Sequence, residues 1–368
     1  MKLNLFKKLE NLEEEKLHPK FKYLRDEVLL RNEKNILSEW TDGFIDRDNK
    51  IIKEFQTTFH SSFWEFYLFA VLKKYGFEIN QNHDRPDFMI SKPVEFNIEA
   101  VVANIKQKGK KENERTFENT ISMLEPPHRQ NNFNQFLDEA ITRYANAIQA
   151  KNKLYKKNYS NCEWVKKHDP FLVALSSYDQ IDYGREFIYP MMALLYGWYY
   201  RPETKGYYKK EYITKPDSSA QIPIGLFESK EYENISAIVF SCTMTLGKLT
   251  ALSIVEENSS YNYNKVFTIR HDNDDQEIPY KMQIVSKETP EYLDDGLFIF
   301  HNPNAKNKLP EEIFKNTNIL QVRIIENCIY FDGGNLPVVS RFNLPKMFLP
   351  EKYIKEFVVE TMLKYNGF

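Results

Sequence analysis

The order of the apolar segments between residues 60 and 178 constrains the fold of this chain more than any other sequence feature. Hydrophobic periodicity separates them into helices and strands: a helix over 62–72, strands over 87–90 and 96–102, a long helix after residue 130, and a fully apolar strand over 171–175. An apolar run without alternation is typical of a central strand, buried on both faces. Helix, strand, strand, helix and strand in this order predict an α/β core, with a mixed sheet flanked by helices.

The remaining segments are expected to pack around this core. Residues 1–40 carry apolar side chains near helical spacing and predict an N-terminal helical segment. Apolar pairs around an Asp-Asn turn at 43–52 predict a hairpin. The region 201–368 is β-rich, and 41–200 holds the core. Further elements are expected as a helix at 187–200, strands at 235–241, 249–255, 265–270, 297–301, 320–325 and 328–332, and a terminal helix at 351–365.

Composition and charge exclude several classes of protein. Lys and Arg number 50 against 52 Asp and Glu, so the chain as a whole is not a basic nucleic-acid coat. Cys162, Cys242 and Cys328 lack the spacing of a zinc knuckle or a disulfide framework. The longest apolar stretch is shorter than the roughly 20 residues of a membrane helix, and the N-terminus lacks a signal-peptide pattern. We therefore expect a cytoplasmic protein with no membrane partner.

Three carboxylates stand among apolar residues, where an unpaired charge is costly. Glu65 interrupts the 62–72 helix pattern, Asp87 opens the first strand, and Glu99 lies within the second strand. A buried carboxylate must be hydrogen-bonded, paired, neutralised or bound to a metal. Acids on two neighbouring strands can converge on one hard cation, and Mg²⁺ accepts one or two carboxylates together with water and phosphate. Asp87 and Glu99 are therefore candidate metal ligands.

Each acid also has a structural explanation. Glu65 fits a capping box with Ser62 at the start of its helix. Asp87 follows Pro86, where an aspartate often serves only as a turn or strand-start residue. Glu99 would be tolerated if it faced solvent on an edge strand. The functional interpretation therefore rests on the three acids taken together.

A helix with Glu65, then Pro86-Asp87 at a strand, then a strand with Glu99 resembles the PD-(D/E)XK, or restriction-endonuclease-like, nuclease superfamily. The resemblance covers roughly residues 55–180. It implies a restriction-endonuclease-like mixed sheet, Mg²⁺ or Mn²⁺ held by Asp87 and Glu99, and support from Glu65. The usual substrate of the superfamily is DNA.

The chain departs from this pattern at the lysine two residues after the strand glutamate, where it has Val101. Some superfamily members supply that cation from another element. The candidates here are Lys106 and Lys108 after the strand, and Lys151 and Lys153 on the long helix. The sequence does not choose among them.

Positive charge gathers along the chain just after the candidate site. Between Asn104 and Lys167 there are 13 Lys and Arg against 7 Asp and Glu. Such residues can grip phosphates and make binding sensitive to salt, although a solvated lysine-rich loop is the more common explanation. The candidate nucleic-acid contacts are Lys110, Lys111, Arg115, Lys156 and Lys157.

These observations predict a Mg²⁺-dependent nuclease that hydrolyses phosphodiester bonds. They favour DNA over RNA as its substrate. Its catalytic residues would be Glu65, Asp87 and Glu99. By analogy with the superfamily, its setting would be restriction or defence against foreign DNA, including phage DNA. The sequence leaves open whether the protein forms a homodimer or works with a partner protein in a defence system. The alternative from another class is a non-catalytic nucleic-acid-binding or scaffold protein on a nuclease-like fold, which the missing lysine favours.

Overall fold

The computed structural model describes residues 2–106, 109–122, 124–130, 132–178, 184–256, 263–272, 274–275 and 277–367. Its α-helices are α1 (Pro19–Asp26), α2 (Arg31–Trp40), α3 (Ile51–Thr57), α4 (His60–Lys74), α5 (Phe117–Ser122), α6 (Phe133–Lys157), α7 (Tyr189–Tyr196), α8 (Leu246–Glu256) and α9 (Ile354–Asn366). Its strands are β1 (Glu78–Asn80), β2 (Phe88–Lys92), β3 (Phe96–Ala103), β4 (Phe171–Ser177), β5 (Trp198–Arg201), β6 (Gly206–Lys209), β7 (Tyr212–Thr214), β8 (Gln221–Pro223), β9 (Ala237–Ser241), β10 (Asn264–His271), β11 (Tyr280–Ile284), β12 (Phe298–His301), β13 (Leu320–Ile325), β14 (Cys328–Asp332) and β15 (Val338–Pro345).

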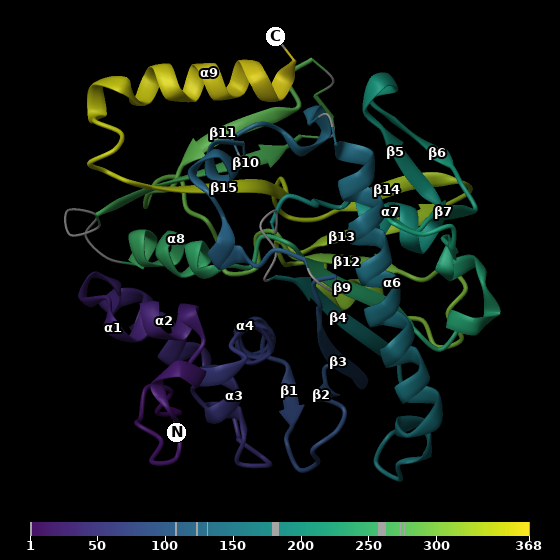
Figure 1. Ribbon diagram of the computed structural model, residues 1–368. Helices are drawn as coiled ribbons and strands as arrows, with labels where there is room; N and C mark the ends of the chain where they lie inside the picture. The colour runs from purple at the N-terminus through teal and green to yellow at the C-terminus, as the bar shows by residue number, and fades with distance from the viewer. Residues whose placement is uncertain are drawn as a thin grey trace.

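Among the described residues, an eight-stranded sheet forms the centre of the molecule, in the order β1-β2-β3-β4-β9-β12-β13-β14. Strands β3, β4 and β9 run parallel to one another, whereas β2 pairs antiparallel with β3, and β12 antiparallel with β9. Helices lie on both sides of this sheet (Figure 1). The predicted α/β class with a mixed sheet flanked by helices is therefore confirmed. The sheet takes strands from both sides of residue 200, and the division at residues 40 and 200 stays a prediction.

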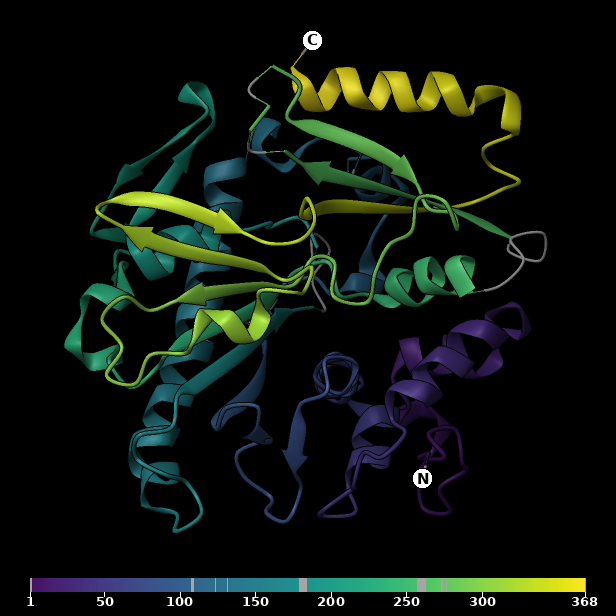
Figure 2. The ribbon, with the colours of Figure 1, turned by 180° about the vertical axis from the view of Figure 1, so that it is seen from behind.

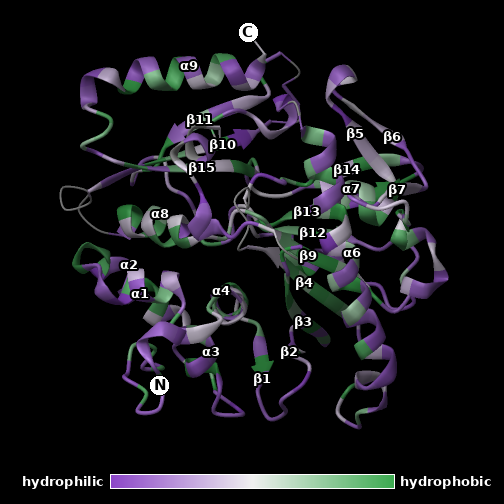
Figure 3. Cartoon of the chain, viewed as in Figure 1, coloured by the Kyte–Doolittle hydropathy of each residue, from purple (hydrophilic) through white to green (hydrophobic). Residues whose placement is uncertain are grey.

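Alternating residues of the central strands enter two hydrophobic cores. On β4, Leu172 and Ala174 pack with α4 and the other N-terminal helices. Val173 and Leu175 point to the opposite face and pack with α6 and α7. Figure 3 shows the hydrophobic colouring concentrated in these central strands. A strand buried on both faces needs apolar residues at every position, and this explains the unbroken apolar run of β4.

A second, three-stranded sheet in the order β11-β10-β15 lies beside the first, and α9 packs against β11. Figure 2 shows this sheet between α9 and the central sheet. The predicted terminal helix and the strands at 265–270, 297–301, 320–325 and 328–332 are confirmed, with bounds that differ by at most three residues.

Two local predictions are wrong. The expected hairpin at 43–52 is a loop that leads into α3, because the Asp46 carboxylate accepts hydrogen bonds from the backbone amides of Lys50 (3.0 Å) and Ile51 (3.3 Å). The expected strand at 249–255 is α8. Its Leu249 packs into one core while the opposite side of the helix packs against β10, so the apolar run lacks a polar face and does not distinguish helix from strand.

The apolar stretch at 187–200 is shorter as a helix than expected. Helix α7 ends at Tyr196, Gly197 follows in the left-handed region with φ 72°, and β5 begins at Trp198. Glycine adopts this backbone conformation without the steric cost that a Cβ brings. Across the part of the chain that the structure describes, no helix is both long and apolar enough to span a membrane.

A buried charge network holds α8, β15 and the loop before β12 together. The Lys248 Nζ donates to Glu291 Oε1 at 2.7 Å and to the carbonyl of Asp295 at 3.0 Å. The Arg341 Nε donates to Glu291 Oε2 at 2.8 Å. All three ionised side chains of the Lys248–Glu291–Arg341 group are almost fully enclosed. Burial alone would raise the pKa of Glu291, but the charges of Arg341 and Lys248 outweigh it and hold the pKa at about 2.

Replacing Glu291 by alanine is expected to lower the free energy of unfolding by about 3–5 kcal/mol, because two cations would remain buried without their counter-ion. Urea unfolding at pH 7 measures this loss. The matched control is Glu360→Ala on the exposed side of α9, which is expected to change stability by less than about 0.5 kcal/mol. Equal effects of the two substitutions would contradict the structural role assigned to Glu291.

Candidate active site

The pairing of β2 with β3 places Asp87 and Glu99 next to each other. Phe88 stands opposite Ile98 in this antiparallel ladder, so Asp87, one residue before β2, stands opposite Glu99. Residues opposite each other in an antiparallel pair share a face of the sheet. The neighbouring Ile98 and Ala100 belong to the core on the α4 side, and therefore the two acids point to the face that α6 covers.

Glu99 lies inside the sheet rather than at an edge facing solvent, and only 3% of it is exposed. Its Oε1 accepts hydrogen bonds from Lys151 Nζ at 2.7 Å and from the Tyr159 hydroxyl at 2.9 Å. Its Oε2 is buried and has no hydrogen-bond partner in the described structure. The edge-strand explanation for Glu99 is therefore wrong, and one carboxylate oxygen keeps an unused capacity to bind a ligand.

Asp87 is half-buried, and hydrogen bonds hold both its carboxylate and its backbone carbonyl. Its Oδ2 accepts a hydrogen bond from the amide of Ala100 at 2.7 Å. The Arg47 Nη2 donates to the Asp87 carbonyl at 3.0 Å, and Arg47 Nη1 donates to the carbonyl of His83. Burial and the negative charge of Glu99 raise the pKa of Asp87 to about 7, against the lowering effect of Lys151. This carboxyl is thus poised to exchange a proton for a cation near neutral pH.

Glu65 lies on α4, which covers the opposite face of the sheet from α6. The capping-box explanation is wrong, because α4 begins at His60 and its N-terminus has no side-chain cap, so Glu65 is well inside the helix. Burial raises the pKa of Glu65 well above its ordinary value, and the charge of Asp87 adds to this effect. Its carboxylate forms no hydrogen bond within the described ranges. Glu65 therefore interacts with Asp87 and Glu99 through its charge, and its supporting role in the site stays a prediction.

The four candidate lysines behave differently. Lys151 reaches Glu99 from α6, and 21% of its side chain is exposed. Lys106 pairs instead with Glu139 at 2.8 Å. Lys153 is exposed on the outer side of α6, and Lys108 lies outside the described residues. Val101 occupies the usual lysine position and packs against the core on the α6 side. The cation beside Glu99 therefore comes from the helix that faces the strand.

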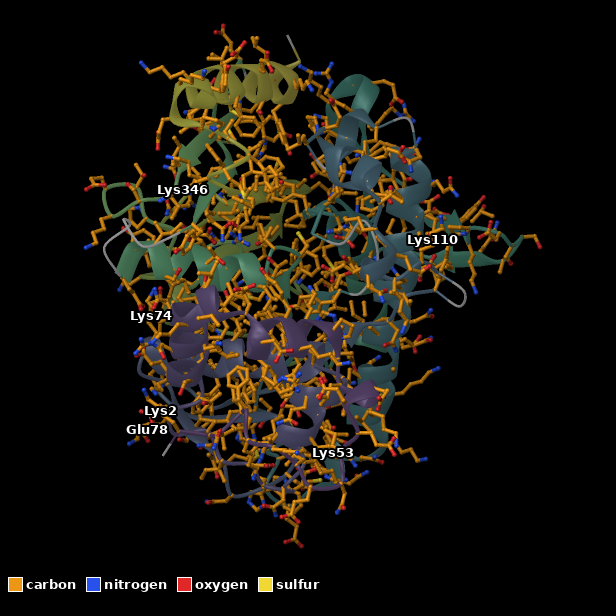
Figure 4. The ribbon with its side chains drawn as sticks, turned by 60° about the vertical axis from the view of Figure 1, so that its left-hand side comes forward. Lys2, Lys53, Lys74, Glu78, Lys110 and Lys346 are labelled. Carbon is orange, nitrogen blue, oxygen red and sulfur yellow. The ribbon has the colours of Figure 1, made fainter. Side chains whose placement is uncertain are left out.

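The basic residues predicted to contact nucleic acid lie on two different segments. Lys156 and Lys157 are in the last turn of α6, beyond Lys151, and the Lys156 Nζ donates to the carbonyl of Glu231 at 2.5 Å. Lys110, Lys111 and Arg115 flank a short 3-10 turn whose Glu112 pairs with Lys20 of α1 at 2.7 Å. Figure 4 shows Lys110 in the right half of the view, well above Lys53 near the lower end. Of the five, only the two on α6 share an element with a residue that contacts Glu99.

Three other residues hold the site together without a sequence motif. Tyr159 lies in the 3-10 turn that follows α6 and reaches back to Glu99. Trp164 donates from Nε1 to the carbonyl of Arg85 at 2.8 Å, and its ring stacks on His83 with the centroids 4.3 Å apart. With Arg47, these contacts fix the turn before Asp87 from two sides. Only a tertiary structure reveals them, because no local pattern distinguishes them from surface residues.

This arrangement offers two carboxylates to a cation. The described residues contain no group of three or more His, Cys, Asp or Glu side chains that could hold a metal ion. The buried Oε2 of Glu99 and the Asp87 oxygen that does not accept from Ala100 are free of hydrogen bonds in the described structure. Mg²⁺ binds through one or two carboxylates with water completing its octahedron, so the donor set fits this ion better than Zn²⁺.

Comparisons with known proteins add no independent assignment. No family model matches the chain, and neither a curated protein nor a solved structure does. The functional argument therefore depends on the geometry of the site and on its resemblance to the nuclease motif.

The raised pKa of Asp87 predicts a pH-dependent stability. The folded protein holds this proton up to about pH 7, whereas an unfolded aspartate loses it near pH 4, so folding is favoured below that range and loses stability as the pH rises through it. The loss is expected to be at most about 4 kcal/mol. Urea unfolding from pH 4 to 8 measures it. In Asp87→Asn this component should disappear, and identical pH profiles for the variant and the wild type would contradict the shift.

Proposed function

We propose that the protein is a metal-dependent nuclease with a restriction-endonuclease-like core, and that Lys151 replaces the lysine missing at Val101. The observation that carries the proposal is the 2.7 Å contact between Lys151 Nζ and Glu99 Oε1, beside a second, unpaired oxygen of the same carboxylate. Two adjacent acids with one lysine are the residue types that the motif requires. The lysine comes from α6 instead of β3.

Each residue has a distinct part in this proposal. Asp87 and Glu99 would hold a divalent ion, which supplies Lewis acidity towards a phosphoryl oxygen and lowers the pKa of a bound water. The ammonium of Lys151 offsets part of the repulsion between the two carboxylates and offers a positive charge to the negative charge that develops at phosphorus. Tyr159 holds Glu99 Oε1, so that the unpaired Oε2 keeps its orientation.

Several features support a polynucleotide substrate. The end of α6 continues from Lys151 to Lys156 and Lys157, which add positive charge beside the site. Contacts of this kind with phosphates strengthen binding at low salt and weaken it as salt rises. DNA as the substrate, defence against foreign DNA as the setting, and a homodimer or defence partner as the assembly follow from the resemblance alone.

A plasmid-nicking assay with Mg²⁺ tests the proposal. Asp87→Asn, Glu99→Gln and Lys151→Met are each expected to reduce the rate by more than about 100-fold, since each removes a charge at the reacting centre. Lys153→Met is the matched control, because it removes an exposed lysine from the same helix and should leave the rate within about twofold. Circular dichroism verifies that every variant is folded.

The same assay separates the nuclease from a nucleic-acid-binding protein. EDTA should abolish cleavage by the wild type, and Mn²⁺ should restore it. A salt-sensitive gel shift without metal-dependent cutting would support the binding protein instead. Equal losses of activity for Lys151→Met and Lys153→Met would remove the reason for placing the missing lysine on α6.

A further inference from the structure

A pocket of about 660 Å³ lies at the other end of α6 from the candidate active site. It is lined by the segment before α6, the start of α7, the β5–β6 hairpin, the β10–β11 pair, β14 and the end of α9. The hairpin stands beside the upper end of α6 in Figures 1 and 2. Phe133 at the start of α6 packs against the pocket residue Tyr189, with ring centroids 5.5 Å apart. Lys151 follows 18 residues later, which is about 27 Å along the helix.

Aromatic rings form the walls of this pocket. The ring of His128 stacks on Tyr280 with the centroids 5.6 Å apart and the planes 14° apart. Tyr189 and Tyr200 form a second close pair at 4.4 Å. Burial lowers the pKa of His128 to about 4, so this ring is neutral at physiological pH. Flat, uncharged rings of this kind are the surfaces on which nucleobases stack.

Polar groups among these rings are available to a ligand. Tyr207 lines the pocket as a half-buried side chain, and the hydroxyl of Tyr365, also in the lining, is buried with no hydrogen-bond partner in the described structure. A buried hydroxyl without a partner is costly, and a ligand that hydrogen-bonds to it removes this cost. The hydroxyls of Tyr189 and Tyr280 lie 3.4 Å apart, so their mutual hydrogen bond is long.

The charges around the pocket favour an anion. Lys205 and Arg129 belong to its lining; Lys205 is exposed and has no ion pair in the described structure. The two acids of the lining, Asp272 and Asp275, lie 2.6 Å and 3.6 Å from the Nζ of Lys281, which offsets their charge. The lining therefore presents cations beside an aromatic cavity.

We propose that this pocket binds a nucleotide unit, with its base among the aromatic rings and its phosphate at Lys205 and Arg129. The volume lies within the roughly 300–1,000 Å³ of small-molecule sites. The unit is either a free mononucleotide or the 5′-terminal nucleotide of a DNA single strand, which share this chemistry. The site is distinct from the candidate active site and does not depend on catalysis there.

Isothermal titration calorimetry of the full chain carrying Asp87→Asn tests the proposal without interference from cleavage. The probes are AMP, GMP, CMP and TMP, the matching nucleosides, and a 5′-phosphorylated hexathymidylate. At least one phosphorylated probe is expected to bind, and its nucleoside at least about tenfold more weakly, because a charge-assisted hydrogen bond is lost. Tighter binding of the hexamer than of TMP identifies the strand end as the source, and the reverse identifies the free nucleotide.

Two pairs of variants locate the binding. Lys205→Gln should weaken the binding of phosphorylated probes about tenfold. Lys215 is an exposed lysine outside the pocket, so Lys215→Gln should leave the affinity unchanged. Tyr207→Leu should weaken the binding of these probes about tenfold or more, because it removes a ring on which a base can stack. Tyr212 is an exposed tyrosine outside the pocket, so Tyr212→Leu should not weaken binding.

Three results would overturn the proposal: no binding of any phosphorylated probe at millimolar concentration, nucleosides that bind as tightly as nucleotides, or equal effects within either pair of variants. None of these results affects the plasmid-nicking assay. The nucleotide-binding proposal can therefore be refuted without refuting the nuclease proposal, and the reverse.

Discussion

The ion pair between Lys151 and Glu99 is the contact on which the organisation of the candidate site depends. A glutamate inside a sheet is destabilising unless a partner offsets its charge, and α6 brings that partner across the face of β3. The pair fixes the position of the helix relative to the strand, and Tyr159 reinforces it from the following turn. Because both donors use the same oxygen, the second oxygen stays buried without a partner beside Asp87.

The charge balance of the pair explains why a cation fits there. Asp87 and Glu99 carry two potential negative charges and Lys151 supplies one positive charge, so in the absence of another cation the lowest-cost state keeps a proton on Asp87. In the proposed nuclease, a divalent ion would replace that proton and stabilise both carboxylates at once. Under this proposal, the raised pKa of Asp87 that weakens the fold above neutral pH also leaves a carboxylate available for a metal ion. This is the usual relation between a functional site and the stability of its scaffold.

The sequence predicted the parts of the fold that depend on local periodicity. Strands β2, β3 and β4 and helix α6 follow from apolar spacing, and Glu99 could be singled out because a carboxylate within a strand needs an explanation. The prediction of a hairpin at 43–52 was wrong because a single side chain, Asp46, determines the turn. The prediction of a strand at 249–255 was wrong because α8 is buried on two sides, so its sequence lacks the polar face of an amphipathic helix. Lys151 could not be chosen over Lys153 from the sequence, since the choice depends on the rotation of α6 against β3. Arg47 and Tyr159 left no local signal at all.

The central claim is that Asp87 and Glu99 share one divalent ion. The most direct measurement is a crystal structure of the wild-type protein soaked in Mn²⁺, with anomalous scattering recorded near the manganese edge. The account predicts a single strong peak between the two carboxylates, within coordination distance of Glu99 Oε2 and of an Asp87 oxygen, while Lys151 stays beside Oε1. A well-ordered site without such a peak at millimolar Mn²⁺, or a peak that contacts neither acid, would contradict it.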